Sequence, residues 1–248
     1  MRDNKKFIIN EFEKVKRLGF VKSNRKNNTG IGKTFEDYMG VVENNFEAPD
    51  LAGYEIKSHR EEVASYITLF TKVPDFPKQP NSYLNSRFGS PYEDNPDLKK
   101  LHISMFATHL SSNFKTYSFK LINDRNLKAI RIGVYDYNTE RLIDSSVGYT
   151  YETIEMILKK KLKNLFYVSA EREMRGNDEY FNFNHAEIYS NPSLEKFLDL
   201  IDKGKIMYDI RIGSFKSGKA MGKTHDHGSG FRILEKNITL LYELHETV

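Results

Sequence analysis

Two carboxylates and an ammonium group lie close together in the chain, at Asp50, Glu55 and Lys57. Residues 54–58 are expected to form a strand, in which successive side chains project from opposite faces. Glu55 and Lys57 then share one face, and Asp50, in a Pro-Asp turn just upstream, can fold back toward them. Because Mg²⁺ takes oxygen ligands, with one or two from protein carboxylates and the rest from water and phosphate, this patch suits a hydrolytic Mg²⁺ site. A surface ion-pair cluster is the alternative interpretation.

Each of these groups has a role in phosphodiester hydrolysis. Asp50 and Glu55 would hold the metal, which polarises the scissile phosphate and lowers the pKa of its bound water. Lys57 would orient that water or offset the charge on the pentavalent phosphorane. Glu36, on a helix expected upstream, could supply a third carboxylate.

A second group of polar residues suits the edges of DNA bases. In a strand expected over Ile206–Ser214, Asp209 and Arg211 share the face opposite Ile210 and Ile212. Arginine donates two hydrogen bonds to guanine O6 and N7, and aspartate accepts one from cytosine N4. One face of this strand could therefore recognise G and C, although a simple salt bridge between the two side chains is an equally good interpretation.

The segment that follows is glycine-rich and basic. Residues 211–232 carry five basic side chains and one acidic side chain, a net charge of +4. We expect phosphate contacts, which position a protein on DNA without specifying sequence, from Lys216, Lys219 and Lys223. His225 and His227 lack a nearby third ligand, and the chain has no Cys, so a base or phosphate contact is favoured over zinc.

The whole chain of 248 residues is long enough for one large domain or two small lobes. Residues 1–33 form a second basic zone, with ten basic and three acidic side chains, on a chain whose net charge is only +4. Two basic zones on an otherwise acidic chain indicate a polyanionic partner. For the first zone, solvated lysines on a surface helix are an equally good explanation.

Composition excludes several classes of protein. The absence of Cys rules out a disulfide scaffold, a Cys-ligated zinc site and thiol catalysis. No apolar run approaches the roughly 18 residues that span a bilayer, and the N-terminus lacks a signal-peptide pattern, so a cytoplasmic protein without membrane contact is expected. The run Gly30-Ile31-Gly32-Lys33-Thr34 is no phosphate-binding loop, because Asn27 stands where that motif needs Gly and the preceding segment is polar.

Helices and strands are expected to mix without regular alternation, which predicts an α/β or α+β fold with a mixed sheet. We expect helices over 4–18, from a Thr34 cap through Val42, over about 151–164, and from Asn191-Pro192-Ser193 to Gly204. We expect strands over 54–58 with a partner at 66–73, hairpins pairing 117–122 with 127–136 and 165–170 with 180–188, and further strands over Ile206–Ser214 and 231–234. The proline-rich segment 74–100 is expected to be a long loop.

Longer blocks of sequence resemble a known enzyme family. The first block comprises Asn28-Thr29-Gly30-Ile31-Gly32-Lys33-Thr34-Phe35-Glu36-Asp37, Ala48-Pro49-Asp50, Glu55-Ile56-Lys57-Ser58-His59 and Thr68-Leu69-Phe70-Thr71-Lys72. The second comprises Asp209-Ile210-Arg211-Ile212-Gly213, Gly222-Lys223-Thr224-His225-Asp226-His227-Gly228 and Phe231-Arg232-Ile233. Both resemble the MvaI/BcnI-type restriction endonucleases, relatives of the MutH mismatch-repair nickase among the PD-(D/E)xK nucleases. The second block looks like the MvaI branch, and only residues 74–116 match poorly.

The resemblance implies an α/β, MutH-like PD-(D/E)xK fold, with a mixed sheet, flanking helices and two lobes that form a DNA cleft. We expect a catalytic lobe over 1–148 and a DNA-recognition lobe over 149–248. The resemblance assigns metal binding to Asp50 and Glu55, catalysis to Lys57 and a supporting carboxylate to Glu36. It assigns base contacts to Asp209, Arg211, His225, Asp226, His227 and Arg232.

The implied activity is Mg²⁺-dependent cleavage of double-stranded DNA by a type II restriction endonuclease. The MvaI branch cleaves CC(A/T)GG, whose G·C pairs suit the arginines and acids of the second block. One catalytic set and one recognition block predict a monomer that cuts the strands in succession, with a protecting methyltransferase in the host but not in complex. A MutH-like nicking repair endonuclease and a non-catalytic DNA-binding module are the alternatives.

Overall fold

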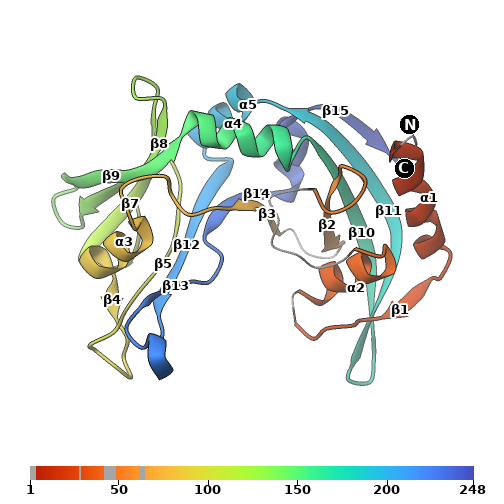
Figure 1. The fold of residues 1–248 in the computed structure, drawn as a ribbon, viewed down its shortest axis with the longest axis horizontal. Helices are drawn as coiled ribbons and strands as arrows, with labels where there is room; N and C mark the ends of the chain where they lie inside the picture. The colour runs from red at the N-terminus through yellow and green to blue at the C-terminus, as the bar shows by residue number, and fades with distance from the viewer. Residues whose placement is uncertain (1–3, 28, 42–48, 62–64) are drawn as a thin grey trace. The chain divides into compact units, whose positions relative to one another are not determined.

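The computed structural model describes residues 4–27, 29–41, 49–61 and 65–248 (Figure 1). The chain forms two compact units, each assembled from separate segments. Unit 1 comprises Met1–Ser65, Met156–Ser193 and Glu235–Val248, and unit 2 comprises Tyr66–Glu155 and Leu194–Leu234. These boundaries differ from the single division expected after residue 148, because strand pairing within each unit joins segments that are distant in sequence.

Unit 1 is built around one mixed sheet with the strand order β1-β11-β10-β2, and β15 pairs with β11. Its strands are β1 (Phe20–Lys22), β2 (Glu55–Arg60), β10 (Asn164–Arg175), β11 (Asp178–Pro192) and β15 (Tyr242–Thr247). The predicted 165–170/180–188 hairpin is confirmed as the antiparallel pair β10–β11. β2 runs parallel to β10, with Glu55 opposite Leu165. Parallel neighbours need a long crossover, and here the chain between β2 and β10 includes the first segment of unit 2.

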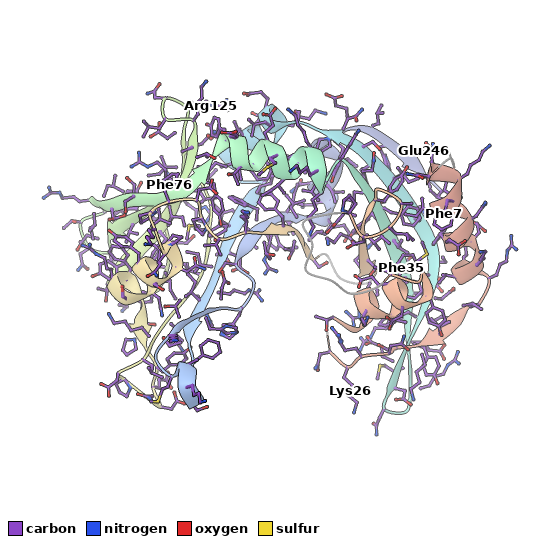
Figure 2. All side chains as sticks on the ribbon, in the orientation of Figure 1. Phe7, Lys26, Phe35, Phe76, Arg125 and Glu246 are labelled. Atoms are coloured by element: carbon purple, nitrogen blue, oxygen red, sulfur yellow. The ribbon has the colours of Figure 1, made fainter. Side chains whose placement is uncertain are left out.

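The helices α1 (Asn4–Lys16) and α2 (Gly30–Tyr38) pack on one face of this sheet. Phe12 of α1 and Phe35 of α2 are fully buried there, and Phe12 meets Phe166 of β10 edge to face. Figure 2 shows Phe35 among the side chains between α2 and the sheet. Ile56 of β2 belongs to this apolar cluster, so its neighbours along the strand point to the opposite face. The apolar face of the sheet thus fixes the direction in which Glu55 and Lys57 project.

Unit 2 contains two antiparallel sheets, with the orders β3-β14-β12-β5-β4 and β6-β7-β8-β9, and β13 pairs with β12. The first uses β3 (Tyr66–Thr71), β4 (Ser90–Pro91), β5 (Lys99–Met105), β12 (Ile206–Ser214), β13 (Thr224–Asp226) and β14 (Gly230–Leu234). The second uses β6 (Ser111–Phe114), β7 (Tyr117–Asp124), β8 (Ala129–Asp136) and β9 (Leu142–Thr150). The predicted hairpin over 117–136 is confirmed as β7–β8.

The other helical segments are α3 (Pro80–Phe88), α4 (Tyr151–Lys160) and α5 (Leu194–Asp202), with the short 3₁₀ helices η1 (Gly218–Ala220) and η2 (Glu235–Leu240). The helices predicted near 151–164 and before Gly204 are confirmed as α4 and α5. None of the helices in the described ranges is long and apolar enough to cross a membrane. The mixed α/β class predicted from the sequence is confirmed.

Three local predictions are wrong. The strand at 66–73 does not pair with β2: β3 pairs with β14 in unit 2, because the chain leaves unit 1 after Ser65. The segment 74–100 is no continuous loop, since Pro80 occupies the first position of α3, where a missing N–H is harmless. α2 begins at Gly30 rather than at a Thr34 cap, and it ends at Tyr38, just before Gly40 with its positive φ of 73°, so the expected extension is wrong as far as the described residues go; Val42 itself lies outside them.

Candidate active site and DNA-recognition site

Asp50, Glu55 and Lys57 come together in unit 1, as their spacing predicts. Lys57 Nζ lies 2.5 Å from Glu55 Oε1, so the two side chains do share a face of β2. Asp50 Oδ2 accepts a hydrogen bond of 2.7 Å from the Ile56 backbone N–H, which folds the turn back onto the strand. The negative charge of Asp50 also contributes to raising the pKa of Glu55, so it acts on that carboxyl group.

Glu55 is a buried acid, with 1% of its surface exposed. Burial is the largest cause that raises its pKa, and the charge of Asp50 acts in the same direction. Lys57 and Lys161 oppose that shift through their positive charges. The site therefore holds a carboxylate whose negative charge is only partly compensated by its neighbours.

The donor atoms suit a hard cation. Glu55 Oε2 is buried and has no hydrogen-bond partner among the described residues, whereas Oε1 faces the two lysines. A buried carboxylate oxygen without a partner is costly, and a divalent ion beside it would remove that cost. In the described part of the chain no cluster of three or more His, Asp or Glu side chains has metal-binding geometry. A site with one or two protein carboxylates is the arrangement that Mg²⁺ uses.

Lys161 is a member of this cluster that sequence reasoning missed. It follows α4, and its Nζ lies 3.6 Å from Glu55 Oε1. Its side chain is 31% exposed, close to the 30% of Lys57. No spacing rule connects Lys161 to Glu55, because they meet only through the parallel pairing of β2 with β10.

Glu36 lies on α2, which packs against β2. A Cβ atom placed on Gly32 would stand 4.0 Å from Glu36 Oε1 and 3.9 Å from Ser58 Oγ. This places Glu36 near Ser58, which shares the Ile56 face of β2, opposite the face of Glu55 and Lys57. Its role as a supporting carboxylate stays a prediction.

His59 continues the row that Glu55 and Lys57 begin, and sequence reasoning assigned it no role. Its ring stacks on Tyr167 of β10 at 4.6 Å, and its Nε2 lies 2.5 Å from Glu235 Oε1. The pairing of Ser58 and Val168 between β2 and β10 sets this stack in place. His59 therefore fixes β2 to β10 and to the start of η2 next to the cluster of Asp50, Glu55 and Lys57.

In unit 2, Asp209, Arg211 and Arg232 meet on one face of the sheet. Arg211 Nε donates to Asp209 Oδ2 at 2.7 Å, so the predicted shared face is confirmed and the alternative salt bridge is present too. Arg232 Nε lies 3.1 Å from the same oxygen. Asp209 is 6% exposed, and the opposite face of the strand carries the buried Ile210 and Ile212.

The loop after β12 folds back along that strand. Asp226 Oδ1 accepts from the backbone N–H groups of Gly228 and Ser229 at 2.9 and 2.7 Å. Its Oδ2 accepts from Asn81 Nδ2 of α3 at 2.8 Å, so Asp226 organises the turn. His225 and His227 pack edge to face at 4.3 Å between ring centres.

His102 of β5 is a second residue that sequence reasoning missed. It pairs with Arg211 across the sheet, and its ring lies 6.2 Å from His227. Burial, followed by the charges of His227, Lys100 and Arg211, lowers the pKa of His102, which keeps it neutral near pH 7. No sequence pattern marks a single histidine in a strand as a neighbour of Arg211 and His227.

The three loop lysines differ in their surroundings. All three are exposed, but Lys216 pairs with Asp94 at 2.7 Å and lies over the Tyr92 ring, whereas Lys219 and Lys223 form no ion pair with a described residue. Lys219 lies on η1, which projects from the sheet as a short turn.

Comparison with known proteins connects these two groups of residues to one family. The chain matches the model of the MvaI/BcnI restriction endonuclease family over residues 9–242. It is similar to the solved structure of restriction endonuclease MvaI in complex with its cognate DNA substrate, at 34% identity and a TM-score of 0.89, covering 100% of this chain and 99% of that one. It is also similar to MvaI in the absence of DNA, at 34% identity and a TM-score of 0.67, covering 100% of this chain and 98% of that one. No curated protein matches the chain.

Proposed function

Because the chain belongs to the MvaI/BcnI restriction endonuclease family and is a type II site-specific deoxyribonuclease, we propose that it cuts double-stranded DNA at CC(A/T)GG with Mg²⁺. Restriction endonucleases of this kind use a divalent metal ion and bind DNA, and the solved MvaI complex contains cognate DNA. The choice of Mg²⁺, the target and the order of strand cutting are the parts that we propose. The observation that carries the metal-dependent chemistry is the buried Glu55 carboxylate, with one oxygen unpartnered and the other beside two lysines.

Asp50 and Glu55 would bind the metal, which supplies polarisation of the scissile phosphate and a water of lowered pKa. Asp50 is held by the Ile56 N–H through Oδ2, which leaves Oδ1 for the cation. Lys57, released from Glu55 once that carboxylate binds a cation, would hold the attacking water or offset charge on the phosphorane. Lys161 would keep positive charge beside Glu55 while Lys57 acts on the phosphate.

The target follows from the second group of residues. A site rich in G·C pairs needs arginine donors for guanine O6 and N7, and Arg211 and Arg232 lie side by side on one sheet face. The adjoining loop carries His225, His227 and the exposed Lys219 and Lys223. Their contacts with bases and phosphates would fix the position of the protein along the duplex. At the central position, A·T and T·A look alike from the minor groove, whereas G·C adds a donor, which fits a site with A or T there.

We further propose that the enzyme acts as a monomer that nicks the two strands in succession. Each unit carries one of the two residue groups, so a single chain has one catalytic set and one base-recognition set. A single catalytic set must act twice to break a duplex. A nicked intermediate is therefore expected early in digestion.

The test is digestion of a plasmid and of phage DNA with Mg²⁺ or with EDTA. We expect nicked circles first, linear fragments later, no change in EDTA, and fragment ends that map to CC(A/T)GG. Persistent nicked circles would identify a MutH-like nicking enzyme, and no cleavage would leave a DNA-binding module. Ends at another site would refute the target alone, and a dimer by ultracentrifugation with no nicked intermediate would refute the monomer.

A further inference from the structure

The base-recognition face of unit 2 contains a carboxylate that is already occupied. Asp209 Oδ1 accepts a hydrogen bond of 2.8 Å from Ser104 Oγ, and Oδ2 accepts one of 2.7 Å from Arg211 Nε. The Arg232 Nε forms an ion pair with the same Oδ2 at 3.1 Å. The Asp209 side chain is only 8% exposed, so little of it can reach a base.

Arg211, by contrast, keeps its end available. The Arg211 side chain is 50% exposed, and within the described ranges its Nη atoms form no hydrogen bond. Arg232 is more enclosed, with 15% of its side chain exposed, and its Nη2 donates a long hydrogen bond of 3.4 Å to the Gly228 carbonyl. Arg211, anchored through Nε, still presents its two Nη groups in the planar fork that matches guanine O6 and N7, whereas Arg232 Nε lies close to Asp209 without the geometry of a hydrogen bond.

Two guanidinium groups this close together repel each other: burial is the largest cause that lowers the pKa of Arg232, and the charge of Arg211 acts in the same direction. The shared carboxylate offsets that repulsion and holds both groups beside one another. Its own direction is set from β5, because Ser104 stands directly opposite Asp209 in the strand register. The hydroxyl thus fixes one carboxylate oxygen while the two arginines share the other.

Building on the proposed function, we propose that Asp209 is a positioning residue, turned by Ser104, that aims Arg211 and Arg232 at guanine rather than accepting a hydrogen bond from cytosine. Ser104 is the new member of the recognition apparatus. It acts through Asp209, and the chemical group that the assembly recognises is the O6/N7 edge of guanine.

The test is a cycle between protein variants and base analogues. Binding is measured in Ca²⁺ to a duplex carrying the site found by sequencing digested phage ends, to the same duplex with 7-deazaguanine, which lacks N7, and to a random duplex. We expect Ser104→Ala to weaken binding to the target about tenfold, to leave random binding within twofold, and to remove most of the penalty that 7-deazaguanine imposes on the wild type. Asp209→Asn should do the same, Ser104→Thr should restore the penalty, and Ser86→Ala, an exposed serine on α3, should change nothing.

Two results would overturn the proposal. A 7-deazaguanine penalty of the same size in Ser104→Ala as in the wild type would mean that Ser104 acts independently of the arginines, for example by contacting a base itself. An Asp209→Asn variant that keeps the full 7-deazaguanine penalty would return Asp209 to cytosine recognition. A wild type that prefers a site other than CC(A/T)GG refutes only the proposed target, since the cycle then uses that site, whereas a wild type without any preferred site refutes both.

Discussion

Replacing Glu55 with Gln is expected to stabilise the metal-free protein while abolishing cleavage. The carboxylate is 1% exposed, its Oε2 has no hydrogen-bond partner in the part of the chain that the structure describes, and burial raises its pKa. Glutamine keeps the size of the side chain and removes the buried charge. A site shaped for a cation is under strain when that cation is absent, and stability and activity then oppose each other.

The change in the free energy of unfolding caused by Glu55→Gln is the cost of the buried charge that is removed minus the contribution of the ion pairs that are lost. A buried polar group without a partner costs about 1–3 kcal/mol, and a charged one costs more. The ion pairs that are lost involve Lys57 and Lys161, which are 30% and 31% exposed and can turn to water, so each contributes roughly 0–1 kcal/mol. The balance favours Glu55→Gln by about 1 kcal/mol, or about 2–4 °C in melting temperature for a chain of this size.

The pH dependence has a definite sign. A carboxyl group whose pKa is raised on folding binds its proton more tightly in the folded state than in the unfolded state. Wild-type stability in EDTA should therefore fall as pH rises from the ordinary glutamate value of 4.5 through the raised pKa of Glu55, and then stay level. The Glu55→Gln variant lacks this step, so its advantage should grow across that window.

The assay is calorimetric unfolding in EDTA between pH 4.5 and 8, beside plasmid cleavage in Mg²⁺. The exposed Glu171→Gln on the same sheet is the matched control and should change neither quantity. A Glu55→Gln protein that is less stable than wild type by more than 1 kcal/mol at pH 7 would refute the reasoning. A stability advantage of Glu55→Gln over wild type that does not change with pH would refute it as well.

Other substitutions test the remaining assignments. Lys57→Ala should abolish cleavage and leave DNA affinity nearly unchanged, because the ammonium acts on the transition state; activity within tenfold of wild type would exclude that role. Asp50→Asn should lose cleavage at ordinary Mg²⁺ concentrations, and normal cutting would place the metal elsewhere. Lys161→Ala should slow single-turnover cleavage about tenfold, or about 1.4 kcal/mol, and an unchanged rate would make it a bystander. Lys219→Ala should weaken binding to target and random DNA alike and lower the salt slope by about 0.9, whereas Lys216→Ala, already paired with Asp94, should change it less; equal slopes would contradict the difference in their surroundings.

Local sequence patterns predicted much of the secondary structure and which site residues share a strand face. Strand alternation was enough to place Glu55 and Lys57 on one face of β2, since the side-chain period of a strand is fixed by its backbone. The same rule put Asp209 and Arg211 together on β12. Both hairpins, β7–β8 and β10–β11, were also predictable, because each joins neighbouring segments through a short turn.

Long-range pairing was not predictable from local patterns. The apolar and β-branched residues of β3 suggested a partner for β2, but many strands satisfy the same pattern, and β3 pairs instead with β14. The chain crosses between the two units at points that no change in composition marks, so the division of the chain came from the pairing of strands far apart in sequence.

Residue types and strand alternation alone predicted Asp50 beside a strand face shared by Glu55 and Lys57, and a basic, arginine-bearing second block. The surroundings of these side chains depend on the tertiary structure. It brought Lys161 to Glu55 and Ser104 to Asp209, and it buried both carboxylates. The physical reason is that charge, pKa and side-chain direction depend on neighbours across the sheet, and those neighbours are chosen by pairing between strands distant in sequence.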